Sequence, residues 1–192
     1  MPATRPAALT SRGRSIRILE WLKTATVVDA RATAAFSVRA ARLAEDGPAL
    51  MGFIAGLQKF EHAFEPNRRT DPLVGHDYFR MLMRRVEERD GRVFVAEQDG
   101  QLVGWCATLV DEGEVYVVEK ERRTGFIAEL FVVEDARGLG VGRALIAAAE
   151  TSFKVRGLPI ASIAVLAGNK RAREVYEAAG FETYTIFLRK KL

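Results

Sequence analysis

A glycine-rich turn between an apolar run and a helical pattern constrains the fold more than any other feature of the sequence. GFIAELFVV (residues 125–133) has the length and composition of a buried strand, and the turn RGLGVG (137–142) leads from it into a stretch with helical apolar spacing. Glycine has no Cβ, so the backbone can approach a ligand closely, and the free N–H groups of a helix start favour an anion. The pattern therefore predicts either a phosphate-binding strand-turn-helix unit or a tight turn without a ligand.

The spacing of the glycines separates this turn from two known phosphate-binding motifs. No Gly-Lys-Ser/Thr follows it, so it is not a P-loop. The dinucleotide fingerprint is also excluded, because the spacing is GxGxG and no acid follows the next strand at Leu166.

The remaining chain alternates strand-like and helical patterns, which predicts an α/β (α+β) domain with a mixed sheet. A hairpin that reverses at Asp99-Gly100 is the clearest local prediction. Strands are expected at 36–45, 92–110, 125–133 and 158–168, with one or two more at 181–192, and helices at 47–64, 79–89, 141–156 and 170–179.

Net charge is concentrated at the start of the chain. Residues 1–35 form a basic extension that accounts for the whole net charge of +4, so the predicted domain, 36–192, is neutral and no nucleic-acid partner is expected. Residues 18–28 of the extension have the spacing of a short amphipathic helix, which would dock on the domain or on a second subunit of a homodimer; a transit-peptide composition is the alternative.

Two absences bound the cellular setting. No run of 18 apolar residues occurs, so no membrane span is expected. The single cysteine, Cys106, has no partner for an internal disulfide, which favours a reducing, cytoplasmic location.

His62, His76 and Cys106 are far apart in the predicted elements, so no metal site is expected.

Two motifs in the expected order resemble the GNAT superfamily of acyl-CoA-dependent N-acetyltransferases. They are ELFVVEDARGLGVGRALI, with its R-x-x-G-x-G pattern, and AVLAGNKRAREVYEAAGF, with its Asn and Tyr. Weaker similarity extends from about 36 to 188. The resemblance implies a mixed, mostly antiparallel central sheet of about six to seven strands, with helices on both faces, that is splayed between its fourth and fifth strands at 127–133 and 160–166.

The resemblance also implies acetyl-CoA as co-substrate. The pantetheine arm would lie in the splay and pair with the backbone near Val132, while amides of the glycine turn would hold the pyrophosphate, in agreement with the anion site inferred from the residues. The expected cofactor-binding residues are Val132, Arg137, Gly138, Leu139, Gly140, Val141, Gly142, Arg143 and Asn169. Asn169 is expected to act also as the N-cap of its helix.

Acetyl transfer requires a neutral amine and a proton for the departing thiolate. Tyr176 matches the family's tyrosine near the CoA sulfur and is the candidate acid, although its helical spacing also suits a core tyrosine. Glu129 is the only charge in an apolar strand, and burial of an unpaired carboxylate is costly. It is the candidate base or amine-binding acid, with a solvated or salt-bridged strand residue as the alternative. Strand periodicity places it on the face of Phe131 unless a bulge shifts the register.

These residues predict an N-acetyltransferase that transfers the acetyl group of acetyl-CoA directly to a primary amine. Two alternatives stay open: a protein N-terminal or lysine acetyltransferase, and a non-catalytic acyl-CoA-binding module. The acceptor is a small-molecule or peptide amine, and the sequence does not choose between them. The acids of the linker 111–125 are offset by nearby bases, which predicts a solvated loop more than an amine pocket.

Overall fold

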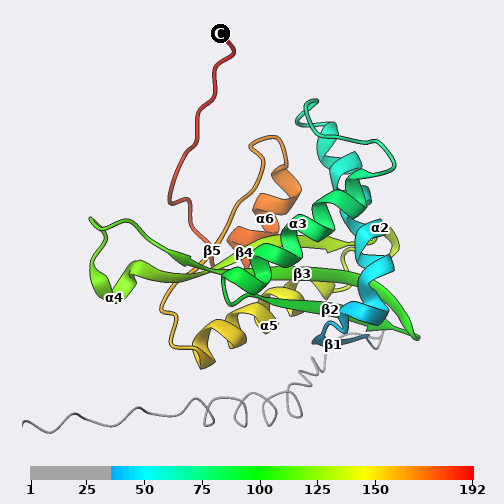
Figure 1. Ribbon diagram of the computed structural model, residues 1–192, viewed down its shortest axis with the longest axis horizontal. Helices are drawn as coiled ribbons and strands as arrows, with labels where there is room; N and C mark the ends of the chain where they lie inside the picture. Colours follow the sequence, from blue (N-terminus) through cyan, green and yellow to red (C-terminus); the bar gives the residue numbers. More distant parts are fainter. Residues whose placement is uncertain (1–35) are drawn as a thin grey trace, which may run out of the picture.

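The computed structural model describes residues 36–192, which form one five-stranded sheet with helices on both faces (Figure 1). The predictions for residues 1–35 lie outside the described part of the chain. The elements are β1 (Phe36–Ala40), α2 (Leu43–His62), α3 (Val74–Glu88), β2 (Arg92–Gln98), β3 (Gln101–Glu112), α4 (Glu119–Arg122), β4 (Arg123–Val132), η2 (Glu134–Ala136), α5 (Val141–Val155), β5 (Ala161–Ile163) and α6 (Lys170–Ala178). Within these residues no helix is both long and apolar enough to cross a bilayer.

The sheet is mixed and mostly antiparallel, as predicted. Its strands follow chain order from β1 to β5, and only the last pair, β4 with β5, is parallel. The predicted hairpin joins β2 and β3 through Asp99 and Gly100, whose φ angles of 50° and 75° suit a tight two-residue turn.

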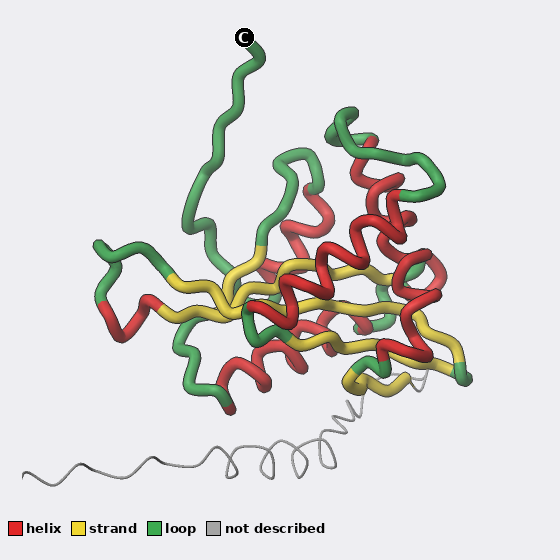
Figure 2. Tube along the Cα trace, in the orientation of Figure 1, coloured by secondary structure: helices red, strands yellow, loops and turns green. Residues whose placement is uncertain are grey.

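Two hydrophobic clusters hold the helices on the sheet. On one face α5 buries Leu145, Ala149 and Phe153, and on the other face α2 and α3 bury Leu50 and Leu82 (Figure 2). The helical spacing of these residues produces the apolar stripes that the sequence predicts.

A close helix–strand approach explains the glycine at position 125. A Cβ added at Gly125 would lie 2.4 Å from the ring of Phe153, so only glycine fits between β4 and α5 at this point. The approach fixes the helix against the strand just before the strands diverge.

The strands β4 and β5 part soon after they meet. Their pairing ends at Ile127 and Ile163, whereas β4 continues to Val132 without a strand on that side. The loop 164–169 and then α6 follow β5 instead. This divergence, called here the β4–β5 opening (residues 128–132 and 164–169), confirms the splay expected between the fourth and fifth strands.

Several predicted bounds were wrong. The first strand ends at Ala40 rather than near 45, because the Asp46 carboxylate accepts the N–H of Arg42 at 2.6 Å and pairs with Arg39, which favours an early start of α2. The strand expected at 158–168 is confined to Ala161–Ile163.

The prediction of one or two strands at 181–192 was also wrong. This segment leaves the body of the domain in an extended path that ends at the label C in Figure 1. Its composition favours a strand, but strand formation requires a neighbour to supply hydrogen bonds, and none lies beside it in the described chain.

Candidate active site

The glycine turn has the geometry of an anion site. Gly138 and Gly140 have φ angles of 83° and 88°, which L side chains adopt only with strain. No side chain caps α5, which begins at Val141, and none of the amide N–H groups of residues 138–143 finds an acceptor of ordinary geometry within the described residues. A Cβ added at either glycine would meet open space, so these backbone groups are accessible to a ligand.

This arrangement fits a phosphate-bearing group. Free N–H groups at a helix start, together with the helix dipole, stabilise a negative charge without any cationic side chain. The acetyl-CoA pyrophosphate predicted for the turn would lie against Leu139, Gly140, Val141, Gly142 and Arg143, all at the start of α5.

Arg137 lies between the glycine turn and α2. Its Nε donates to the carbonyl of Val132 at 3.0 Å, and its guanidinium carbon lies 5.3 Å from the ring centre of Phe60 and 6.0 Å from that of Phe131. The N–H of Val133 donates to the carbonyl of Val103 in β3. Because the N–H and C=O of one peptide group point in opposite directions, the Val132 carbonyl points away from β3, to the side of the β4–β5 opening. The backbone acceptor predicted near Val132 is therefore bound by Arg137 in this structure.

A β-bulge in β4 directs Glu129 toward α2 and α3. Ala107 pairs with Glu129 and Thr108 with Ile127, so that Ala128 has no partner in β3. Ala128 and Phe131 both contact the cluster under α2 and α3, whereas Ile127 belongs to the cluster under α5. From the sequence we expected Glu129 either to share the face of Phe131 or to be shifted from it by a bulge. In the structure Glu129 lies next to a bulge and still shares its face with Phe131.

Tyr78 of α3 is the direct partner of Glu129. Its hydroxyl donates a hydrogen bond to Oε1 of the carboxylate. Burial raises the pKa of Glu129 to about 7, and the Tyr78 hydrogen bond opposes that rise. The sequence did not identify this role, because Tyr78 is separated from Glu129 by 51 residues and has the spacing of a core aromatic.

A second carboxylate, Glu61 near the end of α2, belongs to the same electrostatic site. Burial raises its pKa, and Arg68, whose Nη2 lies 3.4 Å from Glu61 Oε2, opposes the rise. The negative charge of Glu61 also raises the pKa of Glu129. Like Tyr78, Glu61 was not among the predicted site residues, since it lies in a long helix far from Glu129 in the sequence.

Tyr176 and Asn169 lie on the other side of the β4–β5 opening. Asn169 Oδ1 accepts the N–H of Ala172 at 3.2 Å, which confirms the predicted N-cap of α6. Tyr176 packs against the cluster under α5 and lies edge-to-face with Phe181, at 6.3 Å between ring centres. Burial, followed by the charges of Glu61 and Glu129, raises the pKa of Tyr176 to about 12. Tyr176 therefore lies within electrostatic range of the two carboxylates.

The other residues considered in the sequence do not gather into a site. In residues 36–192 no three metal-ligating side chains meet; Cys106 is buried, and His62 contacts the carbonyl of Arg68. Asp111 and Glu112 are ion-paired with Arg89 and Arg123, as expected for a charged surface segment.

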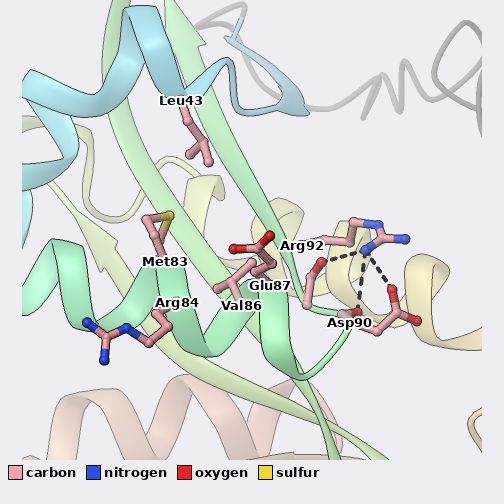
Figure 3. A pocket seen from close by; sticks show the side chains of 8 residues that line it. Leu43, Met83, Arg84, Val86, Glu87, Asp90 and Arg92 are labelled. Atoms are coloured by element: carbon pink, nitrogen blue, oxygen red, sulfur yellow. Dashed lines mark hydrogen bonds and ion pairs between the residues drawn. The ribbon is translucent and has the colours of Figure 1, made fainter.

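The hollow drawn in Figure 3 is separate from these residues. It lies between the start of α2, the end of α3 and the start of β2, and it contains the ion pair of Arg92 with Asp90 at 3.0 Å. None of the residues predicted for catalysis or donor binding lines it.

Comparison with known proteins supports the family predicted from the two motifs. The profile of the acetyltransferase (GNAT) family matches residues 56–181, which include Glu129, the glycine turn and Tyr176. An uncharacterized N-acetyltransferase of Methanocaldococcus jannaschii is 43% identical over 105 residues, which cover 55% of this chain and 44% of the relative. A mycothiol acetyltransferase of Streptomyces coelicolor is 37% identical over 91 residues, which cover 47% of this chain and 27% of the relative. The matched segments thus span less than half of these two curated relatives.

The fold is shared with solved structures. A predicted acetyltransferase of Clostridium acetobutylicum, crystallised with acetyl-CoA, superposes with a TM-score of 0.65 at 19% identity, over 82% of this chain and 96% of that one. At this identity the likeness concerns the fold alone, and the profile match carries the assignment. The chain belongs to the acetyltransferase (GNAT) family.

Proposed function

We propose that this protein transfers the acetyl group of acetyl-CoA directly to a primary amine of a small molecule. One observation carries the proposal: a carboxylate with a pKa near neutrality and an accessible anion site occur on a single strand-turn-helix unit. Glu129 precedes the end of β4 by three residues, and the free amides of 138–143 follow it. The unit thus combines a base with a site for a phosphate-bearing donor.

Glu129 acts as the general base. A pKa of about 7 is close to the working pH, so a large fraction of the carboxylate is ionised. The same pKa makes the carboxylate basic enough to accept a proton from the amine. Tyr78 occupies Oε1 and leaves Oε2 for the acceptor, directly or through a water molecule. Glu61 adds a second negative charge that attracts a cationic amine to the site.

Tyr176 acts as the general acid. Its raised pKa keeps the hydroxyl protonated at neutral pH, and within the described residues that hydroxyl has no hydrogen-bond partner. Since the charge of Glu129 contributes to the raised pKa, the proton that Glu129 accepts from the amine makes Tyr176 a stronger acid. The two proton transfers therefore favour each other in the order that the reaction needs.

The donor supplies an activated acetyl thioester when bound. The amides of 138–143 bind its pyrophosphate, and the Val132 carbonyl is the acceptor for the pantetheine arm once Arg137 has moved. Tyr176 then provides the proton for the sulfur as the C–S bond breaks and the N–C bond forms. No covalent intermediate on the protein is required.

A thiol-release assay with acetyl-CoA and a panel of amines tests the proposal. The panel includes amino sugars, diamines and peptides, so that both small-molecule and peptide amines are sampled. Glu129→Gln is compared with Glu134→Gln, an exposed glutamate in η2, and Tyr176→Phe with Tyr116→Phe, which replaces a tyrosine 83% exposed. We expect the site variants to lose about 100-fold or more in kcat, and the controls to retain activity.

Two other outcomes would replace the proposal. Turnover of peptides with none of free amines would identify a protein acetyltransferase. Calorimetric binding of acetyl-CoA without turnover of any amine would identify a non-catalytic acyl-CoA-binding module.

A further inference from the structure

Arg85 of α3 is a half-buried arginine without a partner in residues 36–192. Its guanidinium forms no ion pair and donates no hydrogen bond within that part of the chain. Six other arginines there are half-buried, and each has a hydrogen bond or an ion pair: Arg39, Arg68, Arg92, Arg122, Arg137 and Arg156. Burial removes part of the water around a charge, and no group of the described chain replaces that water at Arg85.

The guanidinium of Arg85 is accessible to a ligand. Among the described residues, the side chains that have a fully buried nitrogen without a hydrogen-bond partner are Trp105, Arg122 and Arg156. Arg85 is not one of them although it has no partner, so solvent reaches its side-chain nitrogens. A guanidinium of this kind presents paired N–H groups in one plane, which match two oxygens of a carboxylate or a phosphate.

Helix geometry places Arg85 on the same face of α3 as Tyr78. Seven residues are close to two turns, so the two side chains project within about 20° of each other around the helix, about 10.5 Å apart along its axis. The fully buried Leu82 lies between them and holds this face against the sheet. Helical side chains lean toward the N-terminus of their helix, so Arg85 leans toward the turn that carries Tyr78 and its partner Glu129.

The charge of Arg85 acts on the proposed base. Burial raises the pKa of Glu129 and that of Tyr78, and the positive charge of Arg85 opposes both rises. Arg85 therefore lies within electrostatic range of the carboxylate and of the hydroxyl bound to it. The other carboxylate of the site, Glu61, already pairs with Arg68 at 3.4 Å. Arg85 is thus left as a positive charge of the site that no acid of the described chain pairs with.

We propose that Arg85 binds an anionic group of the acceptor, a carboxylate or a phosphate, while the amine of the acceptor faces Glu129. The inference rests on the proposed function and adds a substrate class to it, a primary amine that also carries an oxyanion. Glu129 takes the proton from the nitrogen, and Arg85 holds the other end of the molecule. Two contacts at separate groups of one small molecule orient its nitrogen toward the donor, which a single contact does not do.

Matched pairs of amines test the substrate class. Glucosamine 6-phosphate is compared with glucosamine, and phenylalanine with phenethylamine, because the members of each pair differ in the anionic group. The first pair reports on a phosphate and the second on a carboxylate. We expect the anionic member of at least one pair to have a kcat/KM higher by about tenfold or more, because the hydrogen bonds to Arg85 are charge-assisted. Equal kcat/KM values within both pairs would overturn the proposal.

Two substitutions at Arg85 separate recognition of the anion from the effect of charge on Glu129. Arg85→Gln should abolish the preference for the anionic amine and move the acidic limb of the kcat/KM profile to higher pH. Arg85→Lys keeps the charge but not the planar group, so the limb should stay while most of the preference is lost. Arg84→Gln is the matched control, because Arg84 is exposed and lines the hollow of Figure 3. A preference that survives in Arg85→Gln would place the anion elsewhere.

Calorimetry separates failure of this inference from failure of the proposed function. CoA replaces acetyl-CoA, so that binding of the amine is measured without turnover. The anionic member should bind the CoA-loaded protein about tenfold more tightly than its partner, and Arg85→Gln, shown to be folded by circular dichroism, should remove the difference. That result without turnover of any amine would support the anion site and contradict acetyl transfer. Turnover with no gain from the anionic group would support transfer and overturn the role of Arg85.

Discussion

The hydroxyl of Tyr78 on α3 donates a hydrogen bond to Oε1 of Glu129 on β4. This contact links the helical layer to the one charged side chain of the apolar stretch 125–133, at the bulge that directs Glu129 out of the sheet. Tyr78 holds the carboxylate in one orientation and stabilises its ionised form. It is a positioning residue for the proposed base, and its removal should change the pH dependence of the reaction as well as the rate.

Tyr78→Phe keeps the ring and removes the donor. The hydrogen bond lowers the pKa of Glu129, so its loss raises that pKa above about 7, and the base becomes ionised only at higher pH. A hydrogen bond to a charged group contributes about 1.5 kcal/mol, which corresponds to about one pH unit. We expect the acidic limb of the kcat/KM profile to move upward by about that amount. Tyr116→Phe serves as control, and an unmoved limb would show that Tyr78 does not act on the base.

Glu129→Gln should stabilise the protein at alkaline pH. The folded-state pKa of about 7 lies above the ordinary value of 4.5, so the folded protein binds a proton that the unfolded chain has lost between these values. The free energy of unfolding therefore falls as pH rises from about 4.5 to 7, and the amide removes this loss. We expect thermal unfolding to show a gain of about 3 kcal/mol for the variant at pH 8, and little difference at pH 4. Equal unfolding temperatures at pH 8 would contradict the buried position of the charge.

Local features of the sequence predicted the strand-turn-helix unit of the proposed donor site. The glycine turn depends on neighbours in the chain, and Glu129 is visible as the single charge in an apolar run. The location of the bulge was not predictable, because the register of β4 is set by its pairing with β3. Glu61 and Tyr78 were also missed, since it is tertiary packing that gives Tyr78 its hydrogen bond to Glu129 and brings the charge of Glu61 within electrostatic range.

The C-terminal segment shows the opposite limit of sequence prediction. Its composition predicts a strand, and nothing local distinguishes residues 181–192 from a segment that pairs within its own chain. Whether a strand forms depends on a neighbouring strand, and within the described residues none lies beside this segment. Composition does not reveal whether such a neighbour is present, which is why the prediction was wrong.

Gly140→Ala should weaken donor binding beyond its effect on stability. The φ angle of 88° at Gly140 costs an L residue about 1–2 kcal/mol, and relaxation of that strain turns the N–H groups away from the anion. Gly157→Ala is a matched control, because Gly157 has a φ angle of 69° with equal open space and lies after the far end of α5. We expect both variants to lose similar stability, and only Gly140→Ala to lose about tenfold or more in acetyl-CoA affinity by calorimetry. Equal affinities would place the donor elsewhere.

Donor binding should displace Arg137 from the Val132 carbonyl. The Val132 carbonyl, which we propose as the acceptor for the pantetheine arm, is bound by Arg137 Nε at 3.0 Å, while Phe60 and Phe131 hold the guanidinium in place. Breaking this hydrogen bond costs about 1 kcal/mol, which the donor contacts must exceed. The side-chain Nε–H resonance of Arg137, assigned by its loss in Arg137→Lys, should therefore move when CoA is added in ¹⁵N NMR. The same resonance of Arg39, whose Nε is bound to Glu97 at 2.8 Å, should stay. An Arg137 signal unchanged at saturating CoA would mean that the arm does not use this carbonyl.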